Sequence, residues 1–279
     1  MTLLRAACIQ MRSTAEIAPN IIAACDLIRA AADQGASFIA TPEMTNLLDI
    51  RPGQARAKIN RESEDACLKA LSELARTLGV TLLIGSIAVA LPDDHRFANR
   101  SYLINPRGVI EARYDKIHMF DVEIGDGQAY HESGAYRAGR QATLVDTSIG
   151  RVGMTICYDV RFPHLYRALA QAGADLITIP AAFTKVTGTA HWHTLVRARA
   201  IETGSFVLAP AQGGHHEDGR ETFGHSLIVS PWGEVLAEAD HDAPGFIVAD
   251  LNLADVAKAR ARIPAWRNNQ DFSPPASRV

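Results

Sequence analysis

Cysteine is scarce in this sequence, and neither sign of charge predominates. Four cysteines occur among 279 residues, and no two of them form a Cys-x-x-Cys pair. Widely spaced cysteines favour free thiols over a disulfide framework or a cysteine-rich metal site. Lysine and arginine total 28 against 31 aspartate and glutamate residues, which gives a net charge of −3. So balanced a chain lacks the basic surface that follows a phosphate backbone, and nucleic acid is not an expected partner.

Long apolar runs are missing too. No segment approaches the roughly 18 consecutive apolar residues that a membrane-spanning helix needs. Residues 1–8 lack the basic start, apolar middle and small-residue cleavage site of a secretory signal. We therefore expect no membrane partner, and a cytoplasmic location that fits the free thiols.

Strand-like and helix-like segments alternate along most of the chain, and 47% of the residues are apolar, enough for a large core. The expected strands are residues 4–10, 37–41, 81–86, 109–115, 151–156, 176–180, 205–210, 225–230, 234–238 and 246–250. The expected helices are residues 21–32, 67–78, 162–171, 190–202 and 253–262. This alternation predicts an α/β fold. Because no linker or internal repeat divides the chain, we expect one domain over residues 1–263 and a polar tail over residues 264–279.

Four connections have recognisable chemistry. Residues 105–108 and 230–233 each have a capping residue first, proline second and glycine fourth, as a type I turn prefers. Residues 125–140 and 211–224 are expected to be long irregular loops, which in compact domains are either binding loops or disordered. Their charged residues among glycines favour a role in binding.

Three residues of complementary chemistry follow apolar strands. Cys157 comes between a strand and Pro163, which favours the first turn of a helix, so the cysteine is expected on a sharp turn whose backbone N–H groups face a developing oxyanion. Glu43 and Lys116 end two other strands. At the carboxyl ends of strands such side chains converge, and a carboxylate beside a thiol takes its proton while an ammonium stabilises an oxyanion. The alternatives are a structural cysteine and an ordinary Glu43–Lys116 ion pair.

Taken together, the segments around these residues resemble the three catalytic signatures of the nitrilase superfamily of carbon–nitrogen hydrolases, in the same order. The similar segments are residues 40–44, 114–121, 156–163, 180–184, 187–192, 197–202, 224–226 and 231–233. The resemblance implies a four-layer αββα sandwich, a homodimer and no cofactor. It also implies that Glu43 is the general base, Cys157 the nucleophile and Lys116 the stabiliser of the tetrahedral intermediate, with Glu132 as a second glutamate of the site.

The resemblance also points to a substrate class. Residues 211–220 are most similar to the deaminated-glutathione amidases, with the omega-amidases as the alternative branch and a catalytically silent binding protein as a third possibility. The substrate of either branch is a small amide that carries a carboxylate. We expect Tyr158 to complete the oxyanion hole with its N–H, and Phe183 and Thr184 to line the pocket. Arg161 is expected to bind the substrate carboxylate, or else to pair with an acid.

Departures from the family's pattern bear on the substrate rather than the reaction. His164 stands where glutamate is common, Ser230 replaces an aspartate, and a lid near residues 125–127 lacks the usual proline. Two rival chemistries use histidine. A metal site would need His191 with His193, or His215 with His216, and neither pair has an evident third ligand. A Cys–His hydrolase would use His118 as its base.

Overall fold

The computed structural model describes residues 3–49, 51, 53–124, 129–273 and 275. Two six-stranded sheets form its centre. The first has the order β16(Gly245–Asn252), β1(Leu3–Gln10), β2(Phe38–Ala40), β3(Thr81–Ala90), β4(Phe97–Ile104), β5(Ile110–Asp115). The second has the order β15(Val235–Glu238), β14(Leu227–Val229), β11(Phe206–Ala209), β10(Leu176–Thr178), β9(Gly150–Met154), β8(Thr143–Thr147). In each sheet three central strands are parallel and the flanking strands antiparallel.

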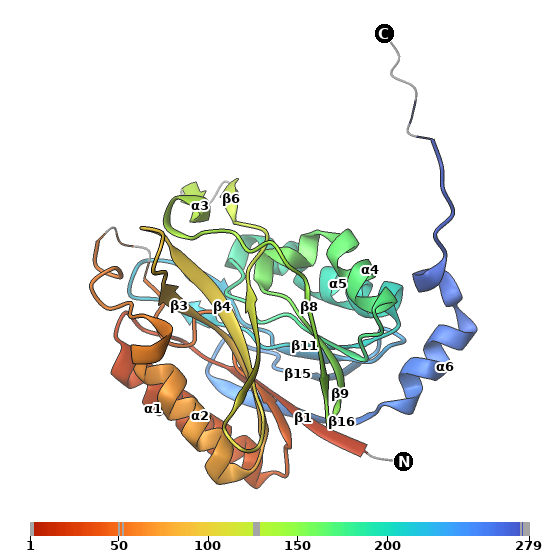
Figure 1. Cartoon of the computed structure of the whole chain (residues 1–279), viewed down its shortest axis with the longest axis horizontal. Coiled ribbons are helices and arrows are strands. Elements are labelled where there is room, and N and C mark those ends of the chain that lie inside the picture. Colours follow the sequence, from red (N-terminus) through yellow and green to blue (C-terminus); the bar gives the residue numbers. More distant parts are fainter. Residues whose placement is uncertain (1–2, 50, 52, 125–128, 274, 276–279) are drawn as a thin grey trace.

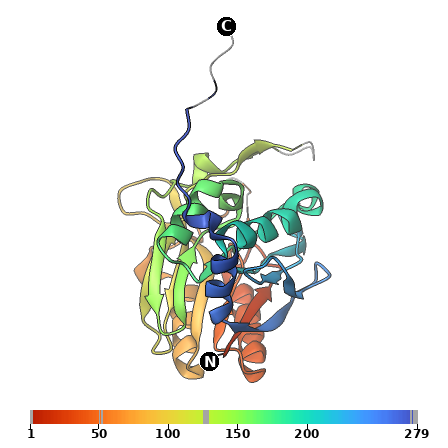
Figure 2. The ribbon, with the colours of Figure 1, turned by 90° about the vertical axis from the view of Figure 1, so that its right-hand side faces the viewer.

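Helices cover the outer face of each sheet, so the chain folds into the predicted αββα sandwich (Figure 1). Helices α1(Ile17–Asp33) and α2(Ala66–Leu78) lie on the first sheet, and α4(Pro163–Gln171) and α5(Lys185–Thr203) on the second. Helix α6(Ala254–Arg262) runs along one side of the sandwich (Figure 2). Among the described residues no helix has the length and apolarity to cross a membrane.

The two faces of the first sheet belong to two different cores, as the two-residue period of a strand requires. In β1, Ala6 and Cys8 pack into the core between the sheets, whereas Ala7 and Ile9 pack against α1 and α2. All four side chains are buried. Strands buried on both faces do not alternate between apolar and polar residues, and this explains why the apolar residues of β1 follow one another without a two-residue period.

Capping residues set the helix boundaries where the sequence carries them. Asp65 accepts a hydrogen bond from the Leu68 N–H at 2.7 Å at the start of α2, and Gly79 ends that helix with φ +66°. Both predicted turns are present, because the N–H of Gly108 donates to the Asn105 carbonyl and that of Gly233 to the Ser230 carbonyl. Helix α5 begins at Lys185, five residues before its predicted start at 190.

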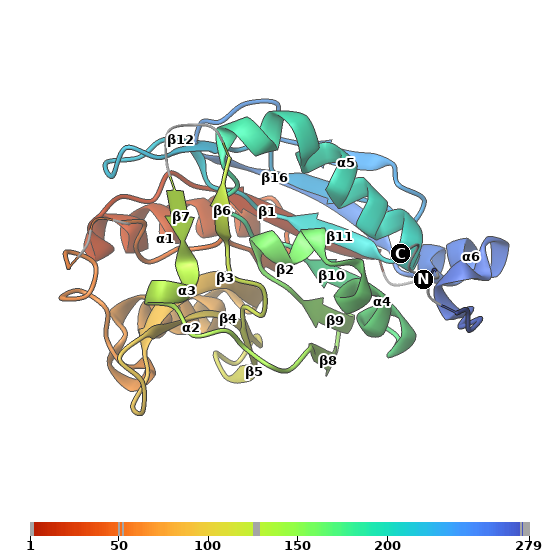
Figure 3. The same ribbon diagram turned by 90° about the horizontal axis from the view of Figure 1, so that it is seen from above.

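The two segments expected to be long irregular loops contain short elements instead. Strand β7(Ala129–His131) pairs with β6(Asp121–Glu123) and leads into α3(Glu132–Ala135), and strands β12(Gly213–His215) and β13(Glu221–Phe223) form a hairpin. Strands of three residues are too short to show a sequence period. Seen from above, the β6–β7 hairpin and α3 lie over one end of the sandwich (Figure 3). The predicted lid at residues 125–127 lies outside the described residues.

The start of the expected tail is packed rather than free. Residues Pro264–Arg267 form a 3₁₀ helix, and Arg167 of α4 donates to the carbonyl oxygens of Ala265 and Asn268. The guanidinium of Arg260 lies 4.7 Å from the centre of the Trp266 ring. Polar composition therefore did not reveal these contacts, which depend on α4 and α6 being nearby.

Gly85 of β3 yields a test of how the first sheet holds Glu43. A Cβ added at Gly85 would lie 2.0 Å from the carbonyl oxygen of Thr41 and 2.5 Å from that of Pro42, the two residues before Glu43. We expect Gly85→Ala to lower the free energy of unfolding by about 1–3 kcal/mol, measured by urea denaturation, because backbone must move. Gly245→Ala is the matched control, since nothing lies within 4 Å of its added Cβ. Equal stability of the two variants would contradict this account.

Candidate active site

Cys157 lies on the sharp turn that the sequence predicts. It comes three residues after β9 ends at Met154, two residues earlier than the strand end expected from the sequence, and it begins a 3₁₀ helix, Cys157–Arg161, that leads into α4. Its φ of +48° is unusual for a residue other than glycine, and its N–H donates to the Pro180 carbonyl at 2.9 Å. The side chain is 7% exposed and lines a cavity. The N–H of Tyr158, in the first turn of that helix, has no partner within the helix, as an oxyanion hole requires.

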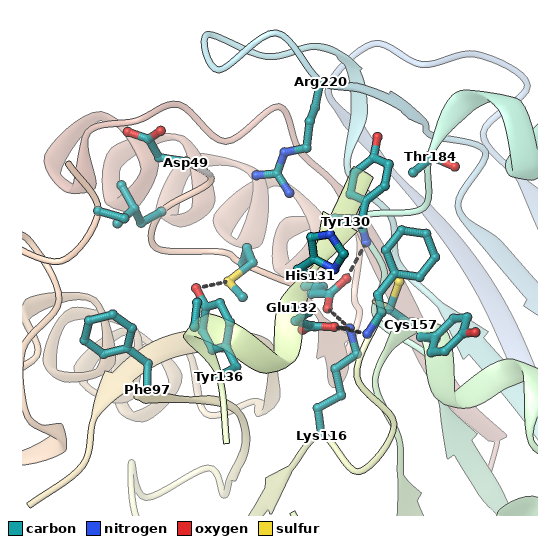
Figure 4. Close-up of a pocket in the computed structure, with 18 of the residues that line it drawn as sticks. Asp49, Phe97, Lys116, Tyr130, His131, Glu132, Tyr136, Cys157, Thr184 and Arg220 are labelled. Atoms are coloured by element: carbon teal, nitrogen blue, oxygen red, sulfur yellow. Dashed lines mark hydrogen bonds and ion pairs between the residues drawn. The ribbon is translucent and has the colours of Figure 1, made fainter. Parts of the chain in front are cut away.

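The three predicted reactive residues meet, together with Glu132. The Nζ of Lys116 lies 2.9 Å from Oε1 of Glu43 and 2.9 Å from Oε2 of Glu132. The Cys157 thiol and the Glu43 carboxylate are close enough that each shifts the pKa of the other. Figure 4 shows Lys116, Glu132 and Cys157 converging at one end of the cavity. Because Glu43 and Lys116 follow β2 and β5 of one sheet and Cys157 follows β9 of the other, the site lies where the ends of the two sheets adjoin.

Backbone and amide groups fix the two carboxylates. Oε2 of Glu43 accepts a hydrogen bond from the Ala182 N–H at 2.8 Å. The side-chain nitrogen of Asn99 donates to Glu43 at 2.9 Å and to Glu132 at 3.2 Å, so it bridges them. Sequence reasoning did not find Asn99, because it is followed by two other polar residues, Arg100 and Ser101, and no local pattern distinguishes it from them.

Burial and charge set the protonation of the group. Burial lowers the pKa of Lys116, but the carboxylates of Glu132 and Glu43 outweigh it, so its pKa lies well above the usual range. Burial raises the pKa of Glu43, but Lys116 outweighs that effect and the net shift is downward. Burial and then the Glu43 charge raise the pKa of Cys157. At neutral pH the site therefore holds an ammonium, a carboxylate and a protonated thiol, so that Glu43 is poised to remove the thiol proton.

The cavity has a volume of about 440 Å³ and continues well beyond this charged group. Residues from the β2–β3 connection, the β6–β7 hairpin, α3 and the β12–β13 hairpin line it. The far part is bounded by Asp49, Phe97 and Tyr136 (Figure 4), and the Arg56 guanidinium lies over the Phe97 ring at 4.9 Å. This volume is within the range of small-molecule sites, and it exceeds what the reacting group alone needs.

Three of the four predicted substrate-binding residues line the cavity. Tyr158, Phe183 and Thr184 do so, but Arg161 is not among the lining residues. Its guanidinium lies 5.2 Å from the Phe183 ring centre and 6.0 Å from that of Tyr158. Nor does Arg161 pair with an acid among the described residues, because its Nη2 faces Nδ1 of His191 at 3.3 Å. Arg161 therefore packs against Tyr158 and Phe183, which line the cavity, without lining it itself.

A different arginine faces the cavity. Arg220, in the connection between β12 and β13, extends toward the middle of the cavity in Figure 4. Its Nε donates to Asp218 at 2.8 Å, and its side chain is 16% exposed. Asp218 thus fixes the guanidinium through one nitrogen. Arg220 was not singled out in the sequence, where it stands at the end of residues 211–220, the segment similar to the deaminated-glutathione amidases, in a loop with charged residues among glycines.

The histidines singled out in the sequence have other partners. Nδ1 of His118 lies 2.7 Å from Oδ1 of Asp159, and its ring stacks on Phe162 with centres 3.6 Å apart. His164 packs edge-on against the same two rings. Because His118 does not line the cavity, the geometry favours Glu43 over His118 as the base.

The two histidine pairs considered for a rival metal site have separate partners. His191 faces Arg161, His215 is exposed, and His216 is buried between Ser13 and Thr222. His193 does have a cluster of its own, which is described below.

Comparison with known proteins agrees with this geometry. Residues 5–261 match the model of the carbon–nitrogen hydrolase family, and the chain belongs to that family. Over 268 residues it is 40% identical to a deaminated glutathione amidase of Synechocystis sp., with 94% of this chain and 97% of that protein covered.

Two solved structures are similar to this chain over most of its length. The NitFhit protein of C. elegans matches with a TM-score of 0.88 and 34% identity, over 96% of this chain and 65% of that one. An amidase of the nitrilase superfamily from Nesterenkonia sp. AN1 matches with a TM-score of 0.77 and 27% identity, over 94% of this chain and 95% of that one. That structure shows the acetamide moiety of fluoroacetamide covalently added at its active-site cysteine.

The protonation of Cys157 can be measured directly. Because burial and the Glu43 carboxylate raise its pKa, we expect no thiolate absorbance from Cys157 as the pH rises from about 6 to about 8.5, the ordinary pKa of a cysteine. The measurement is the ultraviolet difference between the wild type and Cys157→Ser. Glu43→Gln removes the neighbouring charge and is expected to bring thiolate formation to lower pH than in the wild type. A full thiolate signal at neutral pH in the wild type would contradict the assignment of Glu43 as base.

Proposed function

We propose that this protein is an amidase that hydrolyses a small carboxylate-bearing amide, with deaminated glutathione as the favoured substrate. The observation that carries the proposal is that Cys157 and the Glu43–Lys116 ion pair line the same cavity, which has room for a peptide-sized substrate. The similarity to deaminated glutathione amidases supports the substrate. The covalently modified cysteine of the Nesterenkonia amidase supports a cysteine nucleophile.

The first half of the proposed reaction forms a thioester. Glu43 takes the proton of the Cys157 thiol as the sulfur attacks the amide carbon. The carbonyl oxygen becomes an oxyanion, which the Lys116 ammonium and the Tyr158 N–H stabilise. Glu43 then gives its proton to the departing nitrogen, the carbon–nitrogen bond breaks, and the amine leaves. The acyl group remains on the sulfur.

The second half regenerates the enzyme. A water takes the place of the amine and loses a proton to Glu43 as its oxygen attacks the thioester carbon. The carbon–sulfur bond breaks, the proton returns to sulfur, and the acid leaves. With deaminated glutathione the amine is cysteinylglycine and the acid is an alpha-keto dicarboxylic acid. Glu132 holds Lys116 in place throughout by its ion pair.

Arg220 is the substrate anchor that the cavity supports best. Its Nε is held by Asp218, which leaves the two outer nitrogens directed into the cavity (Figure 4). An arginine fixed in this way is suited to a carboxylate, which accepts two parallel hydrogen bonds from a guanidinium. Arg220 therefore replaces Arg161 in the proposed role.

The proposal also covers the domain bounds, the oligomeric state and the cellular location. We assign the hydrolase domain to residues 1–263 and the tail to residues 264–279, and we infer a homodimer in the cytoplasm. Four buried free cysteines suit a reducing compartment. Exposed Ile201 of α5 and Trp232 of the β14–β15 turn, 54% and 48% exposed, are adjacent apolar surface that a second copy would cover.

The first experiment is a substrate panel of deaminated glutathione, alpha-ketoglutaramate and a simple aliphatic amide, with amine release as the readout. We expect cysteinylglycine release from the first compound, and a loss of about 10⁴-fold or more in kcat for Cys157→Ala. A preference for alpha-ketoglutaramate would move the protein to the omega-amidase branch. Silence across the panel would favour a binding protein without turnover.

His118 supplies the contrast for the assignment of the base. We expect Glu43→Gln to lower kcat at least as much as a general base contributes, about 100-fold or more, because Glu43 is the carboxylate that raises the pKa of the Cys157 thiol. His118→Asn should lose far less, since His118 contacts Asp159 rather than the thiol. If the kcat of His118→Asn fell to that of Cys157→Ala, the result would favour a Cys–His hydrolase with His118 as its base.

The anchor has a separate test. We expect Arg220→Gln to raise KM for the carboxylate substrate by about tenfold to 100-fold, the cost of a charged hydrogen bond, and to leave KM for a neutral aliphatic amide unchanged. Arg161→Gln is the matched control and should show no such difference between charged and neutral amides. If Arg161→Gln alone shows the difference, the anchor is misassigned, while the reaction itself remains supported by the substrate panel.

A further inference from the structure

A cluster of two histidines and a glutamate lies outside the active site. His193 comes from α5, His225 lies two residues before the start of β14, and Glu238 ends β15. Nε2 of His193 is 2.8 Å from Oε1 of Glu238, and Nδ1 of His225 is 3.4 Å from the same oxygen. One ligand atom from each residue lies within 4.8 Å of the others. The three residues are 45 or fewer positions apart in sequence but come from three different elements.

The backbone and a neighbouring ring hold His225 in this position. His225 has φ +52°, a conformation that costs free energy for a residue with a side chain. Its carbonyl accepts a hydrogen bond from the Trp192 indole at 2.8 Å. The Phe223 ring stacks on the His225 ring with centres 4.2 Å apart and meets the His193 ring edge-on at 5.9 Å. The two imidazoles are therefore oriented by packing before any ligand arrives.

We propose that His193, His225 and Glu238 bind a divalent transition-metal ion of the zinc class. Two imidazole nitrogens and one carboxylate are a donor set that zinc takes, with water in the fourth position. Ligand atoms about 2.0–2.2 Å from a tetrahedral ion lie roughly 3.3 Å from one another. The two observed distances to Oε1 of Glu238, 2.8 Å and 3.4 Å, are close enough to that value for small side-chain rotations to bring the ligand atoms into place. The histidines thus replace their hydrogen bonds to Glu238 with bonds to the ion.

The surface position of the cluster suits an exchangeable ion. The side chains of His193, His225 and Glu238 are 38%, 23% and 32% exposed, so an ion enters without unfolding and a water completes its coordination. Hard ions such as Mg²⁺ and Ca²⁺ prefer oxygen ligands, and a site with two imidazoles selects against them.

The site would connect the surface to the wall of the cavity. Phe223 contacts the rings of both histidines and follows Glu221 and Thr222, which line the cavity. It also packs against Gly188 of α5, where an added Cβ would lie 2.3 Å from that of Phe223. A bound ion would fix α5 to the ends of β14 and β15 behind this wall, and its expected effect is on stability rather than on chemistry.

The test is titration of the full-length protein with ZnCl₂ by calorimetry. It is run in the Cys157→Ser background so that zinc binding to the catalytic thiol does not contribute. We expect one Zn²⁺ per chain, a raised Tm, and with Co²⁺ the visible absorbance of a four-coordinate ion with nitrogen and oxygen ligands. MgCl₂ and CaCl₂ at the same concentration should give no heat and no change in Tm.

Variants assign the signal to these residues. Loss of residues that merely orient metal ligands costs about 10–100-fold in affinity, so we expect His193→Ala and Glu238→Gln, which each remove a ligand, to weaken binding by about 100-fold or more. His191→Ala is the matched control, because it removes an exposed histidine of the same helix from outside the cluster.

Two results would overturn the proposal. The first is an absence of Zn²⁺ binding in the Cys157→Ser protein, which would leave the cluster as a set of hydrogen-bonded side chains. The second is binding that His193→Ala and Glu238→Gln leave as tight as His191→Ala does. Neither result bears on the proposed amidase reaction, which the substrate panel tests separately.

Discussion

The buried ammonium of Lys116 is the interaction on which the rest of the site depends. Its side chain is 3% exposed, and an ammonium so far from water is stable only with close counter-charges. Glu43 and Glu132 supply them at 2.9 Å each. Removing one partner of such a buried pair typically costs about 3–5 kcal/mol, so the positions of the two glutamates are tightly constrained. The same constraint keeps Glu43 ionised and Cys157 protonated.

The sandwich is what satisfies this constraint. Glu43 and Lys116 leave the ends of two strands of the first sheet, Cys157 leaves a strand of the second, and Glu132 comes from the α3 segment over the same end of the molecule (Figure 3). A carboxylate that must contact both an ammonium and a thiol therefore sits at the junction between the sheets. The cores between and outside the sheets hold that junction rigid, because close-packed interiors do not deform continuously.

The far part of the cavity is built by different segments of the chain from those that hold Glu43, Lys116 and Cys157. Glu43, Lys116 and Cys157 follow strands, whereas the far part of the cavity is built by the β2–β3 connection, the later residues of α3 and the β12–β13 hairpin. Such connecting segments tolerate change better than strands do, which allows one reaction to serve different amides. Arg220 belongs to these segments, and Phe223, beside the histidine cluster, belongs to the same hairpin.

The sequence by itself predicted an α/β fold from its alternation of helix-like and strand-like segments, because helix and strand periods are local. The ordered motifs, by their resemblance to a family, added the αββα arrangement and singled out Glu43, Lys116 and Cys157. The sequence also indicated the turn at Cys157, whose positive φ follows from the strand-to-helix junction. Short paired strands such as β12 and β13 were not predicted, because a segment of three residues shows no period.

Only the tertiary structure decided which side chains meet. Asn99 bridges two glutamates because β4 passes beside both, Arg220 rather than Arg161 faces the cavity because a hairpin folds over it, and His193 acquires His225 and Glu238 from two other elements. Each of these contacts joins residues that are far apart along the chain. Nothing in local sequence encodes the distance between them, because that distance is set by how whole layers pack.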